Sequence, residues 1–290
     1  MSDLLIRLGG LLSQLREFQR LWLPLAILAP ILAIMAIVAP EFFQLTNILI
    51  VARQSSIVGV LAVGMTLVIL TAGIDLSVGS ILAVSGVVMA LLLNDGMPLA
   101  VALPACIAVG AGIGALNGIG IARLGIQPFI MTLASMVTLQ GIALQLANGQ
   151  PQAFSASGSI FDFFGNGGIG QIPGPILIFL IMALGGWALL RYLPFGRFLY
   201  AIGGSKEAAR LSGVRISRTL IGAYLLSGLC AGIAGAMTAS QLSTGDPTVG
   251  GTTELDAIAA VVIGGTSLFG GVGGMGGTVV GALLLAVLAN

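Results

Sequence analysis

The sequence contains no histidine, and among its 290 residues it has only one lysine, Lys206, and two cysteines. Proton relays and imidazole metal sites need histidine, and Schiff-base chemistry needs lysine, so most classes of membrane enzyme lack their usual residues. Cys106 and Cys230 both lie inside long apolar segments, where we interpret them as small buried hydrophobic residues. The sequence therefore predicts no catalytic residue, no disulfide and no metal site.

Charge is also scarce, because charged residues make up 7% of the chain and hydrophobic residues 57%. Such a composition cannot cover a surface that faces water. Apolar segments of roughly 20 residues recur along the chain, each long enough to cross ~30 Å of hydrocarbon as a helix. The sequence predicts an all-α, polytopic transmembrane helical bundle, with one transmembrane domain at 21–290 and a separate segment at 1–20.

Nine spans are expected from these apolar segments. They cover 21–39, 46–70, 76–93, 98–121, 127–147, 173–190, 219–239, 254–269 and 275–289. An odd number places Asn290 outside the cytoplasm, directly after an apolar helix and without a polar anchor. We therefore expect that a tenth helix is missing and that the chain is truncated.

The basic residues give the orientation of these spans. With a cytoplasmic amino terminus, every lysine and arginine except Arg53 lies inside, as the positive-inside rule requires. Leucines at helical spacing in 1–20 predict an amphipathic helix on the cytoplasmic leaflet, and a contact with a neighbouring subunit is the alternative. The loop 191–218 concentrates six of the basic residues: Arg191, Arg197, Lys206, Arg210, Arg215 and Arg218.

A short helix is predicted inside this loop. Ser205 is a good amino-terminal cap, Glu207 suits the first turn, and Gly213 suits the left-handed position that ends a helix. Two turns are unstable alone in water, so we expect the helix to dock onto a soluble partner. The preceding Gly203 and Gly204 lack the spacing of an ATP-binding loop, so this chain is not expected to hydrolyse ATP.

Glu207, Ala208, Ala209 and Gly213 spell EAAxxxG, and here the chain resembles the permease subunits of ATP-binding-cassette importers. Three further segments, 62–80, 125–136 and 254–274, are similar to the ribose-type monosaccharide permeases in content and order. The resemblance implies a type II importer fold of ten helices in the bacterial inner membrane, and it covers nearly the whole chain.

The same resemblance implies the partners. These are a cytoplasmic ATPase, a periplasmic sugar-binding protein, and a second copy of this chain or a close paralogue, all within membrane lipid and without nucleic acid. ATP would be used by the ATPase, and this chain would bind no cofactor. The coupling helix would include Ser205, Lys206, Glu207, Ala208, Ala209, Arg210 and Gly213.

Polar residues inside the spans are candidates for the translocation path, since neutral sugars bind through hydrogen bonds and ring stacking. They are Asp75, Ser77, Asn117, Gln127, Phe129, Thr132 and Ser135. Two alternatives remain open. Asp75 can instead cap the helix that begins at Leu76, and the other polar side chains can link helices to one another.

The segment 240–256 is expected on the external side, where it would line the gate and contact the binding protein. The residues expected to make this contact are Asp246, Thr252, Thr253, Glu254 and Asp256. A solvated loop with a helix cap is the alternative for each of them.

Glycines at four-residue intervals predict close helix packing at 110, 114 and 118, at 228 and 232, and at 277 and 281. The run from Gly270 to Gly277 predicts a tight inner turn. A phosphate site is disfavoured there because no lysine or arginine lies nearby in the sequence.

Two other classes of function are weighed against an importer subunit. A secondary transporter or channel for a small neutral solute is expected to carry buried charge pairs or histidine relays, which the spans lack. A membrane enzyme needs clustered catalytic groups, and the sequence offers only scattered carboxylates. The importer subunit is therefore the preferred hypothesis, and the sequence does not choose among ribose-like pentoses, hexoses and related polyols.

Overall fold

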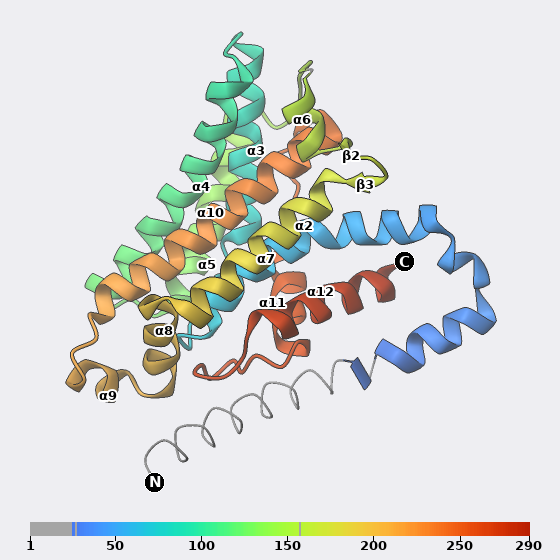
Figure 1. Ribbon diagram of the computed structural model, residues 1–290. Coiled ribbons are helices and arrows are strands. Elements are labelled where there is room, and N and C mark those ends of the chain that lie inside the picture. Colours follow the sequence, from blue (N-terminus) through green and yellow to red (C-terminus); the bar gives the residue numbers. More distant parts are fainter. Residues whose placement is uncertain (1–24, 27, 157) are drawn as a thin grey trace.

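The computed structural model describes residues 25, 26, 28–156 and 158–290, and nearly all of their regular structure is helical (Figure 1). The predicted amphipathic segment 1–20 lies outside the described residues. Helices lie side by side in a bundle, joined by short loops, and the few strands have two residues each. The all-α membrane bundle expected from composition is confirmed.

Within the part of the chain that the structure describes, five helices are long and apolar enough to cross a membrane. They are α2 (Leu45–Ile69), α4 (Leu99–Arg123), α5 (Pro128–Leu146), α7 (Gly174–Tyr192) and α10 (Ile216–Leu242). Shorter apolar helices are Leu28–Val38, α3 (Val78–Asn94) and α12 (Met275–Ala289). Each of these helices corresponds to one predicted span, with boundaries that differ by a few residues except in the first, where the apolar helix is Leu28–Val38.

The predicted span 254–269 is different in the structure. Its helix, α11 (Thr253–Ile263), has 11 residues, which rise only ~16 Å, about half of the hydrocarbon thickness. Gly265 follows with a positive φ of 87° and helps to end it. Hydropathy predicted a full span because the apolar sequence continues past the point where the helix stops.

The chain reaches α11 by running alongside α3 without forming a helix. A Cβ atom added at Gly245 would lie 2.8 Å from Val87 Cα, in the second half of α3. One added at Gly250 would lie 3.2 Å from Gly79 Cα, in the first turn of α3. Because eight residues of helix separate Val87 from Gly79, the segment descends ~12 Å along α3.

The remaining elements lie at the two ends of the bundle (Figure 1). At one end are α6 (Ser159–Phe164) and two antiparallel pairs. These are β1 (Gln152–Ala153) with β4 (Thr244–Gly245), and β2 (Gly168–Ile169) with β3 (Ile172–Pro173). The opposite end carries α8 (Pro194–Gly204) and α9 (Lys206–Leu211). The 3₁₀ helix η1 (Pro40–Phe43) precedes α2.

The centre of the bundle is formed by α10 against α4, α2 and α3. Glycines let the backbones of α4 and α10 touch, because a Cβ atom at Gly110 would lie 2.8 Å from Gly232 Cα and one at Gly114 2.9 Å from Gly228 Cα. The predicted role of these glycines in close packing is confirmed. At α12, Gly277 packs on Gly264 in the same way.

We expect Gly114→Ala to destabilise the protein by about 1–3 kcal/mol, because the added methyl group has no space between α4 and α10. The measurement is the thermal unfolding midpoint of the purified protein in detergent. Gly112→Ala is the matched control on the same helix, since a Cβ atom there meets nothing within 4 Å. Equal losses in the two variants would contradict the packing argument.

Candidate functional site

The first candidate site is the break between α2 and α3. After α2 ends at Ile69, the backbone turns at Ala72, whose φ is 62°, in the left-handed region. The loop before α12 closes the end of α2, because the backbone N–H of Gly271 donates to the carbonyl of Leu70 at 3.0 Å. The end of α8 also touches this point through Gly203. The interruption predicted at 71–79 is therefore confirmed.

Asp75 is fully buried at this break and accepts three hydrogen bonds. Its Oδ1 accepts from the backbone N–H of Ser77 at 3.1 Å and from Ser77 Oγ at 2.5 Å, and its Oδ2 accepts from Ser227 Oγ on α10 at 2.9 Å. The cap residue of α3 is Ser77, which makes no capping bond through its side chain. Asp75 therefore holds the residue before α3 and ties it to α10, rather than capping α3 directly.

The hydrogen-bond network continues from Ser77 into α4 and α5. Asn117 Nδ2 donates to Ser77 Oγ at 2.9 Å, and Ser135 Oγ donates to Asn117 Oδ1. Thr132 Oγ1 donates to the carbonyl of Pro128 at 2.9 Å and lies 3.3 Å from the carbonyl of Ile74. The fold thus brings five predicted path residues together, and their geometry is that of links between helices.

Two predicted path residues lie apart from this network. Gln127 and Phe129 are exposed at the start of α5, where Phe129 presents 52% of its surface. Their position on an open helix face differs from the buried position of Asp75 and Asn117. The role of all seven residues in translocation stays a prediction.

Sequence reasoning missed two residues of α10. Ser227 and Tyr224 are fully buried, and no pattern in this apolar helix distinguishes them from packing residues. A Cβ atom at Gly73 would lie 2.5 Å from the Tyr224 hydroxyl, so the turn needs glycine there. Within the described part of the chain this hydroxyl has no hydrogen-bond partner.

The second candidate site is α9. Ser205 Oγ accepts from the backbone N–H of Ala208 at 3.2 Å, and Gly213 has a φ of 81°. Both local predictions, the cap and the left-handed end, are confirmed. Arg210 forms an ion pair with Glu207, with Nη2 2.5 Å from Oε1, and this hydrogen bond lowers the pKa of Glu207.

One side of α9 is anchored and the other is open. Ala209 is buried in a cluster with Ile202, Leu220 and Tyr224. Lys206, Glu207, Ala208 and Arg210 are exposed. Leu211 exposes 77% of its surface, which makes it an apolar contact point that motif reasoning missed. An anchored helix with an open, mixed surface suits a protein contact.

The third candidate site is the segment 246–256, whose five predicted residues do not share one surface. Asp246 Oδ1 accepts from Thr248 N at 2.8 Å and from Thr248 Oγ1 at 2.7 Å, which closes a local turn. Thr252 and Asp256 are exposed, and Thr253 is half-buried. Glu254 is 7% exposed and lies against Gly79 at the start of α3, far along that helix from the point where Gly245 touches it.

A small hollow opens beside Glu254. It has a volume of about 70 Å³ and is lined by Ser80 of α3, Gln140 of α5, Gly250 and Glu254. Its walls supply a hydroxyl, an amide and a carboxylate, which are the groups that bind sugar hydroxyls. For metal ions, the described residues contain no group of three or more histidine, cysteine or acidic side chains.

Comparison with known proteins gives consistent matches. The family described as the permease component of the branched-chain amino acid transport system matches residues 47–290. The ribose import permease protein RbsC of Escherichia coli (strain K12) is 43% identical over 281 residues, which cover 95% of this chain and 88% of that protein. RbsC of Bacillus subtilis (strain 168) is 41% identical over 285 residues, or 98% and 86% of the two chains.

A relative with another sugar in its name is also similar. The D-allose transport system permease protein AlsC of Escherichia coli (strain K12) is 39% identical over 266 residues, which cover 91% of this chain and 81% of that protein. No solved structure matches the chain. These similarities confirm the resemblance that the sequence motifs predict.

We expect Ser227→Ala to cost about 1–3 kcal/mol, because it removes a hydrogen bond to a buried carboxylate. Asp75→Ala should cost more, since it leaves the hydroxyl groups of both Ser77 and Ser227 without their acceptor. The measurement is the unfolding midpoint in detergent, together with abundance in the membrane.

Ser217→Ala is the matched control, because Ser217 lies on the same helix and its hydroxyl donates an exposed hydrogen bond, to the carbonyl of Ala122, instead of a buried one. Its effect should stay within about 0.5 kcal/mol. If Ser227→Ala behaves like this control, Asp75 does not tie the break to α10. If Asp75→Ala lowers abundance but leaves uptake per molecule unchanged, the network links helices without a role in translocation.

Proposed function

This chain belongs to the family of transport-system permease components, and from that premise we propose that it is the membrane-spanning subunit of an ATP-binding-cassette importer for a monosaccharide. The observation that supports the proposal is sequence identity: over nearly its whole length, about two fifths of the residues of this chain are identical to those of permeases named for ribose and allose. The chain would perform no covalent chemistry, and it would reside in the bacterial inner membrane with its amino terminus in the cytoplasm.

A cytoplasmic ATPase is the proposed partner of α9, and it would bind and hydrolyse the ATP, so this chain needs no cofactor. Lys206, Arg210 and Leu211 offer two charges and an apolar contact on the open side of the helix. Ala209 on the other side packs in the same cluster as Tyr224 of α10. Displacement of α9 would therefore press on the centre of the bundle rather than on a free loop.

The translocation path is proposed on the open face of α5. This helix buries only Thr132, Leu139 and Ala143, and its exposed side carries Thr138 and Gln140 beside apolar residues. Polar groups at membrane depth are favourable where they face a partner or a water-filled path. We place a second copy of the chain, or a close paralogue, opposite this face, with the hollow at Glu254 opening into the path.

A periplasmic sugar-binding protein is the proposed partner at the other end. It would contact the outer part of the 240–256 segment, including Asp246 and Thr248, and deliver sugar to the path. Glu254 lies too deep for such a contact, so we assign it to the sugar rather than to the binding protein. The remaining apolar helix faces would contact membrane lipid.

The function is tested with vesicles that contain this chain, its ATPase and its sugar-loaded binding protein. We expect sugar accumulation that requires both ATP and the ATPase. Leu211→Asp should reduce ATP-dependent uptake by about tenfold or more, because it places a charge in the centre of the proposed contact.

Leu124→Asp is the control for this variant, since Leu124 is also a highly exposed leucine but lies after α4, outside α9. Uptake that survives Leu211→Asp would argue against docking at α9. Accumulation by vesicles that hold only this chain, without ATP, would show a secondary transporter instead.

At the path, we expect Glu254→Gln to lower the apparent affinity for sugar in this uptake assay by roughly tenfold, since hydrogen bonds to a charged acceptor are worth about 1.5–3 kcal/mol. Asp256→Asn is the control, because Asp256 is exposed on the same helix. Unchanged affinity in Glu254→Gln at normal abundance would remove Glu254 from the path. Binding of the ATPase should be unaffected in both variants.

A further inference from the structure

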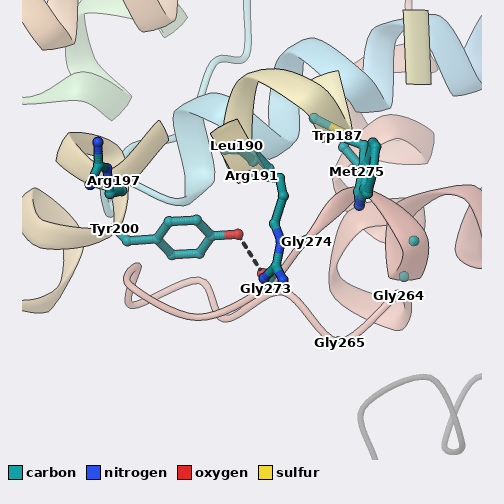
Figure 2. Close-up of a pocket in the computed structure, with 12 residues that line it drawn as sticks. Trp187, Leu190, Arg191, Arg197, Tyr200, Gly264, Gly265, Gly273, Gly274 and Met275 are labelled. Atoms are coloured by element: carbon teal, nitrogen blue, oxygen red, sulfur yellow. Dashed lines mark hydrogen bonds between the residues drawn. The ribbon is translucent and has the colours of Figure 1, made fainter. Parts of the chain in front are cut away.

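A cavity of about 370 Å³ lies beside the carboxyl end of α7 (Figure 2). Its walls come from Trp187 and Arg191 of α7, Arg197 and Tyr200 of α8, and the glycine-rich stretch 273–277 at the start of α12. None of these residues belongs to the sugar path or to the exposed side of α9. The cavity therefore needs an explanation of its own.

The groups around this cavity are suited to an anion. Two arginines line it, and no carboxylate among the described residues does. Figure 2 shows the Arg191 side chain pointing toward Gly273, whose carbonyl accepts a hydrogen bond from the Tyr200 hydroxyl at 2.9 Å. The first turn of α12 lies at the same wall. Its cap residue is Gly274, which has no side chain to bond the free backbone N–H groups of that turn. These N–H groups add to the positive potential of the arginines.

The sequence disfavoured a phosphate site in this glycine run because no basic residue lies near it along the chain. The fold contradicts that reason. It brings Arg191 of α7 to the run and places Arg197 of α8 on another wall of the same cavity. Guanidinium groups bind phosphate through pairs of parallel hydrogen bonds, so the missing element of the site is supplied by tertiary structure.

Aromatic side chains place the cavity at the level of the lipid headgroups. Trp187 and Tyr192 stack edge to face at 5.5 Å near the end of α7, and they expose 46% and 66% of their surfaces. Such half-exposed tryptophan and tyrosine residues mark membrane interfaces. Farther into the span, Leu180, Ile181 and Leu184 are exposed on the helix face that leads to Trp187.

We propose that this cavity binds the phosphate of an anionic phospholipid, whose acyl chains lie along the exposed face of α7. Basic pockets between transmembrane helices on the cytoplasmic side are suited to anionic headgroups. The bound lipid would hold α7 and α8 against the loop before α12. Because Gly271 of that loop supports the end of α2, the lipid would also stabilise the break at Asp75.

The test uses the full chain with Trp22→Phe, which leaves Trp187 as its one tryptophan. The probes are phosphatidylglycerol and phosphatidylcholine with brominated acyl chains, which quench nearby tryptophan, added to the protein in mixed micelles. We expect phosphatidylglycerol to quench Trp187 at a mole fraction about 25-fold lower than phosphatidylcholine does, since each of the two arginines contributes roughly fivefold.

Arg191→Gln with Arg197→Gln should abolish this preference, and replacement of both by lysine should retain most of it. Arg123→Gln with Lys206→Gln is the control, because it removes two cytoplasmic charges outside the cavity. Equal quenching by the two lipids, or equal loss in the control, would overturn the proposal. Full competition by millimolar inorganic phosphate would also overturn it, by showing a site for a soluble anion.

Discussion

The structure depends on one constraint, which is that a helix broken inside a membrane must satisfy its polar groups without water. The break between α2 and α3 meets this constraint through the Asp75 carboxylate, which accepts from Ser77 on one side and Ser227 on the other. The carbonyl of Leu70 at the end of α2 is bonded by Gly271 from a distant loop. Three helices, α2, α3 and α10, and one loop therefore meet where the sequence interrupts an apolar run with a single carboxylate.

This meeting point is connected to α9 by side-chain packing. Tyr224 lies against the Gly73 turn and shares a buried cluster with Ala209 of α9. A force on α9 thus acts, through side chains already in contact, on the turn that positions Asp75. Because packed interiors are stiff, such a contact chain transmits displacement over its length, whereas a charged loop in water would not.

Most elements were predictable because their signals are local. Hydropathy located α2, α4, α5, α7 and α10, and cap chemistry at Ser205 and Gly213 located α9. Hydropathy failed at α11, since it measures the composition of a segment and not the depth at which a helix begins. Ser227, Tyr224 and the approach of Arg191 to Gly273 were not predictable, because each depends on which helices become neighbours.

Glycine contacts also divide the bundle into parts of different rigidity. Helices α4 and α10 touch backbone to backbone at Gly110, Gly114 and Gly228, so sliding between them meets many close contacts at once. The loop before α12 is joined to α2 and α8 differently, through a backbone hydrogen bond at Leu70 and the close approach of Gly203 to Gly270. A motion of this loop relative to α2 and α8 would strain that junction, whereas α4 and α10 would move together.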